Sequence, residues 1–340
     1  AQIESLLVRT GWIEPERFWE EVDLTGDGVP ELLLSIRDRE QMDRFMPPGD
    51  FAVLADGRVQ YRYFAQYEQF DQAPPRLQAT MDLTGDGLPD GVIGTEYCGA
   101  HTCTQEYELI SAHFGRITPL SGSEEPYPRI ALSYSDVSFG DETGDGLPDI
   151  VLYGGFIGSV GAGPYQRGRT EIWGWDAAAG QLELAETRWD PTNYRFHLIF
   201  EANDLFASGD YFAAMPLYTR AVSDPTLEDG EGLLDGVSTY DASRQFAAFR
   251  LMVANSFINP AHVVANWQEW LVEAYPAAPI TAAATAYVDN FLVTEDQAAA
   301  CAAATAVLET SDHPTGPLAD LGYAWPSLTA ETVCPAGQGA

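Results

Sequence analysis

The sequence contains no lysine, because all 17 of its basic residues are arginine. This absence excludes chemistry that depends on a lysine amine, such as Schiff-base formation, P-loop phosphate binding and proton abstraction by a lysine base. The Gly-rich run at 154–163 is therefore interpreted as a flexible loop between strands and not as a phosphate cradle.

Long apolar runs and common catalytic motifs are also missing. No stretch approaches the ~18 consecutive apolar residues of a transmembrane helix, so membrane insertion is not expected. The histidines show no H-x-H or i,i+4 spacing; they are His101, His113, His197, His262 and His313. No G-x-S-x-G or H-E-x-x-H motif occurs. We expect no enzymatic activity, and the alternative is a glycosidase-type carboxylate pair among the 51 acidic residues.

Positive charge is scarce throughout the chain, whose formal net charge is −34. Such a surface repels nucleic acid and anionic membranes, so neither is an expected partner. It also repels other copies of itself unless cations or apolar patches intervene.

Only four cysteines are present, and four cysteines allow three pairings. Cys98 and Cys103 flank a short segment between two strand-like runs, a spacing that suits a clamp across a hairpin. Cys301 lies in an Ala-rich helical stretch and Cys334 lies near the end of the chain, so that this pair would staple the tail. The alternatives are free thiols, or a metal pair of Cys98 and Cys103 with His101. No second Cys/His pair completes a zinc tetrahedron, so we predict two disulfides.

What the sequence does contain is one phrase of ten residues used three times. It reads DLTGDGVPEL from Asp23, DLTGDGLPDG from Asp82 and DETGDGLPDI from Asp141, so the copies are 59 residues apart. A constant period of this length indicates stacked or radially arranged units that share one core. Hairpin signals such as Asp56-Gly57 lie between the copies, so each period holds about four short strands, the content of one propeller blade.

Within each copy, oxygen-bearing groups fall at alternate positions. Positions 1, 5 and 9 carry carboxylates, position 3 carries a threonine hydroxyl, and position 7 offers its backbone carbonyl. Oxygens at alternate positions of a tight loop converge on a point, which suits Ca²⁺. The alternative is an acidic turn between strands. The predicted ligands are Asp23, Thr25, Asp27, Val29 and Glu31; Asp82, Thr84, Asp86, Leu88 and Asp90; and Asp141, Thr143, Asp145, Leu147 and Asp149.

These loops resemble the VCBS and FG-GAP repeats of extracellular proteins, whose D-x-[DN]-G-D-G-x-x-D loops bind calcium between strands of β-propeller blades. The match covers roughly residues 15–190. The resemblance implies about three Ca²⁺ sites and blade-like sheets. The chain differs from the family pattern by having threonine at position 3. It also has only three copies, whereas a closed propeller has four to eight blades. The resemblance therefore does not imply a ring.

Strands are expected around each loop, at 18–22 and 32–36, at 77–81 and 92–93, and at 130–137 and 150–153. An amphipathic segment at 3–8 and a short helix or turn at 14–19 precede them. Hairpins are expected at 51–64, at 107–117 and at 170–184.

From about residue 194 the apolar period changes from 2 to 3.6, which indicates helices. The residues that resemble the tetratricopeptide pattern of two antiparallel helices are Leu198, Ala202, Leu205, Gly209, Asp210, Tyr211, Ala214, Tyr218, Ala221 and Pro225. Pro216 fits this pattern only within the first turn of its helix. Further helical pairs are expected at 243–258 with 261–275 and at 280–293 with 297–308. A capping box is expected from Thr294 to Gln297. The acidic insert at 223–240 is predicted to be a solvated loop, and the alternative is a fourth, degenerate cation site.

Together these patterns predict a three-unit, propeller-like antiparallel β domain at 1–190 and an all-α, tetratricopeptide-like domain at 191–340. Calcium loops, disulfides and a first residue other than Met lead us to expect a processed, extracellular or cell-surface protein. The predicted function is a calcium-binding structural protein that self-assembles into a homopolymer such as a surface layer, fibre or tube. The alternative is a monomeric binding module, with a helical groove for a protein or peptide or a blade face for a glycan. Trp173, Trp175 and Trp189 could stack on sugars, and the alternative for them is packing in a core.

Overall fold

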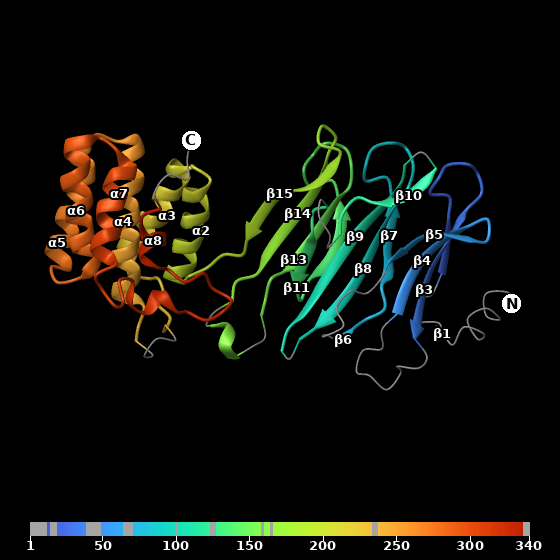
Figure 1. Ribbon diagram of the computed structural model, residues 1–340, viewed down its shortest axis with the longest axis horizontal. Helices are drawn as coiled ribbons and strands as arrows, with labels where there is room; N and C mark the ends of the chain where they lie inside the picture. Colours follow the sequence, from blue (N-terminus) through green and yellow to red (C-terminus); the bar gives the residue numbers. More distant parts are fainter. Residues whose placement is uncertain are drawn as a thin grey trace. The chain divides into compact units, whose positions relative to one another are not determined.

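The computed structural model describes residues 12–13, 19–38, 49–63, 71–99, 101–113, 115–122, 127–157, 160–163, 166–232 and 237–335. The chain divides into two compact units (Figure 1). The first consists of residues 1–159 and 168–190, and the second of residues 160–167 and 191–340. The expected segment at 3–8, residues 14–18 of the expected helix or turn at 14–19, and the last five residues of the tail lie outside the described residues.

The first unit contains three antiparallel sheets, one for each repeat. The first sheet has the order β1-β3-β4-β5, with β2 also paired to β3. Its strands are β1 Trp12–Ile13, β2 Trp19–Val22, β3 Glu31–Asp38, β4 Gly49–Ala55 and β5 Arg58–Tyr63. The β4–β5 turn is formed by Asp56 and Gly57, both with positive φ, as the Asp-Gly signal predicts for a type I′ hairpin.

The second sheet has the order β10-β9-β8-β6, with β7 also paired to β8 and β11 to β9. Its strands are β6 Asp71–Gln72, β7 Arg76–Met81, β8 Asp90–Cys98, β9 Cys103–His113, β10 Arg116–Pro119 and β11 Ile130–Ser133. The third sheet has the order β12-β13-β14-β15. Its strands are β12 Asp136–Gly140, β13 Asp149–Gly154, β14 Arg169–Asp176 and β15 Gln181–Trp189.

The single strand expected at 130–137 is wrong. The chain leaves the second sheet after Ser133 and enters the third sheet at Asp136. Between them Tyr134 adopts a φ of 48°. A positive φ is uncommon for a bulky residue, and without a glycine the sequence carries no turn signal at this point.

The three sheets pack face to face, with the second sheet in the middle (Figure 1). One apolar cluster joins the first and second sheets and includes Leu33 and Val53 with Ile93 and Ile110. Another joins the second and third sheets; its members include Val92, Leu109, Ile150 and Leu152. Residues of opposite parity along β8 therefore point into different interfaces, as the pleat of a strand buried on both faces requires.

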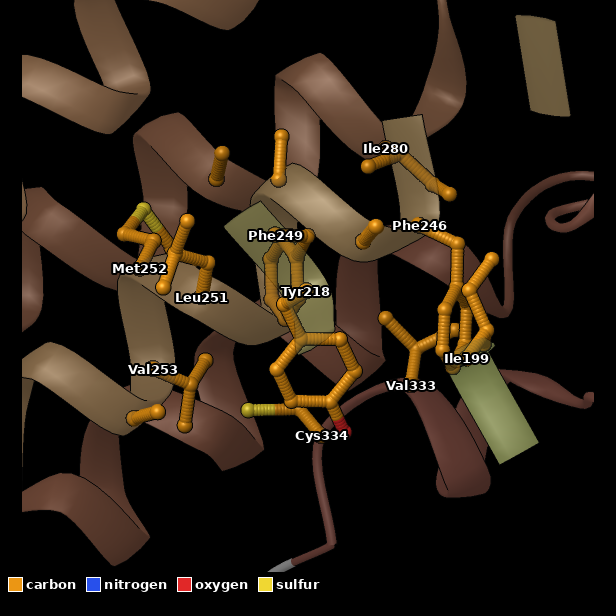
Figure 2. Close-up of a cluster of buried hydrophobic side chains, with 14 of the residues drawn as sticks. Ile199, Tyr218, Phe246, Phe249, Leu251, Met252, Val253, Ile280, Val333 and Cys334 are labelled. Carbon is orange, nitrogen blue, oxygen red and sulfur yellow. The ribbon is translucent and has the colours of Figure 1, made fainter. Parts of the chain in front are cut away.

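The second unit is helical, and consecutive helices pack in pairs. Its elements are η2 Val160–Ala162, α2 Arg195–Ala207, α3 Tyr211–Ser223, α4 Tyr240–Ile258, α5 Ala261–Ala274, α6 Pro279–Thr294, α7 Gln297–Leu308, η3 Gly316–Ala319 and α8 Ala330–Val333. Buried side chains surround α4, from Phe246 to Ala254, so this helix lies at the centre of the unit. Figure 2 shows part of this core, in which Tyr218 of α3 lies near Phe249 of α4. The predicted fold class, antiparallel β sheets followed by helical hairpins, is confirmed.

Three local predictions in this unit are corrected. Pro216 lies in the second turn of α3 and not in the first, so the Phe212 carbonyl loses its helical partner at a position where Phe212 itself is 78% exposed. The N-cap of α7 is Asp296, whose carboxylate accepts a hydrogen bond from Ala299 N, whereas Thr294 ends α6. The insert is not simply solvated, because Asp229 pairs with the buried Arg195.

Both predicted disulfides are present. Cys98 pairs with Cys103 across the β8–β9 hairpin, and Cys301 of α7 pairs with Cys334. The described part of the chain has no free cysteine, so the alternatives of free thiols and of a Cys–His metal site do not hold. Two disulfides are typical of proteins from an oxidising environment. None of the described helices is long and apolar enough to span a bilayer.

Candidate metal centres

The three repeated phrases form three loops that each connect paired strands of one sheet. Loop 1 joins β2 to β3, loop 2 joins β7 to β8, and loop 3 joins β12 to β13. The glycines at positions 4 and 6 have φ between 70° and 93° in all three loops. Only a residue without Cβ adopts this region readily, so the glycines reverse the chain and bring position 9 to the start of the next strand.

The aspartate at position 1 accepts two backbone hydrogen bonds from its own loop. In every copy one oxygen accepts from the N–H of position 6, at 2.9 Å from Gly28, 2.9 Å from Gly87 and 3.1 Å from Gly146. The other oxygen accepts from position 5 in loop 1 and from position 4 in loops 2 and 3. This carboxylate therefore fixes the turn.

The carboxylate at position 9 is buried in every copy, with exposures of 3% for Glu31, 0% for Asp90 and 1% for Asp149. One of its oxygens accepts hydrogen bonds from the N–H groups of positions 2 and 3, at 2.7–3.3 Å. In loops 1 and 3 the threonine hydroxyl at position 3 donates to the other oxygen, at 3.0 and 3.2 Å. Position 9 thus links the start of each loop to its end.

Loop 2 lacks this last bond. Thr84 Oγ1 and Asp90 Oδ1 are both buried, and neither has a hydrogen-bond partner of good geometry. Burial raises the pKa of the Asp90 carboxyl, and interactions with the hydroxyls of Ser111 and Thr84 and with the N–H groups of Leu83 and Thr84 offset only part of this effect. Buried oxygens without a hydrogen bond of good geometry are costly, so loop 2 satisfies its position-9 carboxylate less well than loops 1 and 3 do.

The carboxylates at position 5 are exposed. One oxygen of Asp27, Asp86 and Asp145 accepts from the N–H of position 7, each at 2.8 Å. The second oxygen of each accepts none of these hydrogen bonds, and none of the three aspartates is in an ion pair of the described residues.

The three carboxylates of one loop do not meet at a point in this arrangement. Among the described residues, only Glu96, Cys98 and Cys103 bring three possible ligand atoms within 4.8 Å of one another. The two cysteines form a disulfide, so this group is not a metal site. The loops supply the hard oxygen donors that Ca²⁺ prefers, but their carboxylates would have to approach one another to coordinate it.

The loops form a row along one edge of the stacked sheets. A methyl group added to Gly26 would lie 2.5 Å from Leu88 Cδ2, and one added to Gly85 would lie 3.2 Å from Leu147 Cδ1. The position-7 side chain of each later loop thus covers the position-4 glycine of the loop before it. At the two ends of the row, Val29 is 59% exposed and Gly144 has no neighbour within 4 Å.

Position 2 also depends on the place in the row. Leu24 and Leu83 are fully buried between their own sheet and the next one. Loop 3 has no following sheet, and its position 2 is Glu142, which is exposed and forms an ion pair of 2.7 Å with Arg188. A polar residue on the outer face is what a terminal repeat requires.

The other candidates from the sequence have structural environments. Trp173 and Trp175 pack against the core between the second and third sheets, and Trp189 lies beneath the guanidinium of Arg169. His197 is buried, hydrogen-bonded to Thr192 and stacked on a tryptophan. Sequence reasoning did not identify Arg250, a buried cation without an acidic partner among the described residues. Comparison of the chain with protein-family models, with curated proteins and with solved structures found no significant match.

Proposed function

We propose that this protein is an extracellular calcium-binding structural protein, in which each loop of the row holds one Ca²⁺. The carboxylates of positions 1, 5 and 9, the hydroxyl of position 3 and the backbone carbonyl of position 7 would supply the ligands. The observation that carries this proposal is the pair of buried oxygens of Thr84 and Asp90 in loop 2, neither of which has a hydrogen bond of good geometry. A cation is the partner that both oxygens can share, because neither needs a hydrogen-bond donor when it coordinates a metal.

The nine carboxylates give a second reason. Three of them lie in each turn, and their mutual repulsion opposes the compact loop unless a cation is bound. The likeness of the loops to VCBS and FG-GAP repeats supports the same metal, and the two disulfides support an extracellular location. Bound calcium would then stabilise the row of loops and, through position 9, the strands that begin there.

Calcium-dependent melting tests this proposal. At a free concentration one hundred times Kd, a ligand that binds only the folded state stabilises it by about 2.7 kcal/mol for each site. We expect chelation to lower the melting temperature of the sheet unit by at least several degrees. The variant Asp86→Asn should lose part of the calcium effect and keep its bond to Leu88 N.

The matched control is Asp56→Asn, which removes the same charge from the β4–β5 turn, where asparagine also tolerates the positive φ of 51°. It should respond to calcium as the unchanged protein does. Identical melting curves in calcium and in excess chelator would refute the calcium sites.

Self-assembly into a layer, fibre or tube is the role that we propose for this scaffold, with calcium offsetting the repulsion between chains of net charge −34. Light scattering in millimolar calcium, compared with sodium chloride of equal ionic strength, tests it. The second candidate is a monomeric binding module, favoured by the charges on two edge strands, β5 of the first sheet and β15 of the third. Arg58 and Arg62 lie on β5, and Glu186 and Arg188 lie on β15. Charges on edge strands oppose pairing between copies. A protein that stays monomeric in calcium would support this second candidate.

A further inference from the structure

Arg250 of α4 is a buried cation without a counter-ion. Its residue is 3% exposed, its Nε donates to Tyr218 Oη at 3.1 Å, and its guanidinium lies 3.8 Å from the centre of the Phe206 ring. Nη1 is buried and has no hydrogen-bond partner. No carboxylate of the described chain forms an ion pair with Arg250.

The missing partner is not explained by a shortage of acids, since the chain has 51 of them. Arg195, which is equally buried in the same unit, pairs with Asp229 at 2.9 Å and donates to backbone carbonyls. A buried arginine of this unit can therefore have its counter-ion within the chain. A buried charge left unpaired is strongly destabilising. The charge of Arg250, which has no acidic partner among the described residues, therefore points to a ligand.

Arg250 also lines a cavity of about 740 Å³, a volume within the range of small-molecule sites. The cavity is open to solvent and is lined by α2, α4, α7 and the segment that follows η3. Its apolar wall includes Phe200, Ala306 and Leu328. The Cys301–Cys334 disulfide joins α7 to the C-terminal segment and so fixes two of these walls relative to each other.

Three exposed acidic residues line the same cavity, Asp204, Glu309 and Glu331. Partial burial and the nearby charge of Glu201 raise the pKa of the Asp204 carboxyl. None of the three forms an ion pair with Arg250, so the positive and negative groups of the cavity are separated. A simple anion would be attracted by Arg250 but repelled by the acidic side chains. A simple cation would be attracted by the acidic side chains but repelled by Arg250. A small zwitterion satisfies both.

We propose that this cavity binds a free α-amino acid with an apolar side chain. Its carboxylate would accept hydrogen bonds from the guanidinium of Arg250, its ammonium group would face the wall carboxylates, and its side chain would pack against Phe200 and Leu328. The site lies within the helical unit and does not depend on calcium.

Three probes of nearly the same shape test the charge pattern. L-leucine carries both charges, 4-methylpentanoate lacks the ammonium group, and 3-methylbutylamine lacks the carboxylate. We expect titration calorimetry in the presence of chelator to show that each chain binds one leucine. The affinity of each analogue should be at least tenfold lower. No binding of leucine, or equal binding of either analogue, would overturn the proposal.

Substitutions then assign the binding to this cavity. Arg250→Met keeps an unbranched side chain as far as the position of Nε and removes the charged guanidinium group, and it should abolish leucine binding while the melting temperature without ligand stays the same or rises. A falling melting temperature together with retained binding would instead show that Arg250 is structural.

Asp204→Asn provides a second variant that leaves the core intact. It should lower the affinity for leucine at least tenfold and reduce the difference in affinity between leucine and 4-methylpentanoate. The matched control Asp289→Asn removes an exposed charge from α6, outside the cavity, and should leave leucine binding unchanged. If Asp204→Asn and Asp289→Asn behave alike, the wall carboxylates do not recognise the ammonium group and the proposal fails.

Discussion

The row of loops predicts that truncating the side chain at position 2 lowers the free energy of unfolding by very different amounts in different copies. Leu83, at position 2 of loop 2, is 0% exposed and packs between the second and third sheets. Truncation of a buried leucine to alanine costs about 2–5 kcal/mol, with the cavity accounting for the spread. Glu142, at the same position of loop 3, forms an ion pair with Arg188 in which both side chains are 45% exposed. Loss of such an exposed pair costs less than about 1 kcal/mol.

Urea unfolding measures this contrast. With a slope of about 2 kcal/mol per molar urea, Leu83→Ala should lower the midpoint by about 1–2.5 M, and Glu142→Ala by less than about 0.5 M. Hydrogen exchange detected by mass spectrometry, on peptides from β8 and β13, restricts the readout to the sheet unit. A third variant, Glu142→Leu, restores the residue of the other copies and should still give no large gain, because no further sheet covers it. Equal costs for Leu83→Ala and Glu142→Ala would refute the stacked arrangement.

Three further predictions use other contacts. Gly26→Ala should destabilise the protein more than Gly144→Ala in thermal melts, because both have positive φ but only Gly26 lies against the leucine of the next loop. The pKa of Asp90 is raised from its ordinary value of 3.8, so its ionised form destabilises the fold above that raised pKa and the penalty disappears below 3.8. In chelator, Asp90→Asn should therefore be more stable than the unchanged protein at pH 7, and this difference should shrink as the pH falls; a constant difference would contradict it. Replacing both cysteines of Cys301–Cys334, which are 33 residues apart, should cost about 4 kcal/mol in urea unfolding, against about 2 kcal/mol for Cys98–Cys103, which are 5 apart.

Much of the fold could be predicted because the sequence marks its turns with glycine, proline and aspartate. The loops, the hairpin at Asp56-Gly57 and the helical pairs all follow from such signals and from the change of apolar period near residue 194. Predictions failed where a turn lacked these residues. The break at Tyr134 is one case. The segment 160–167 is a different case, because it contains glycine and proline and yet belongs to the helical unit, although strands precede and follow it.

The candidate sites could be predicted only as residue types at fixed spacing. Three carboxylates in one loop indicate a cation, but the sequence does not show that position 9 is buried and bonded to the start of the loop. Hydrogen bonds within the loop decide which oxygens are left for a metal, and these depend on backbone geometry. Arg250 shows the same limit, since a lone arginine in an apolar helix gives no sign of whether an acid elsewhere in the chain will reach it.

The ends of the row show how three copies can pack as a stack without closing into a ring. In a closed propeller every blade has a neighbour on both faces, so equivalent positions of each repeat should have the same burial. Here position 7 is exposed only at Val29 in the first copy, and position 2 changes from buried leucine to the exposed Glu142 in the last. A stack ends in this way because its first and last members each lack one neighbour, and a charged residue on the last face keeps another sheet from packing there. Positions 2 and 7 of each copy therefore distinguish a stack from a ring, whereas the loop residues that all three copies share do not.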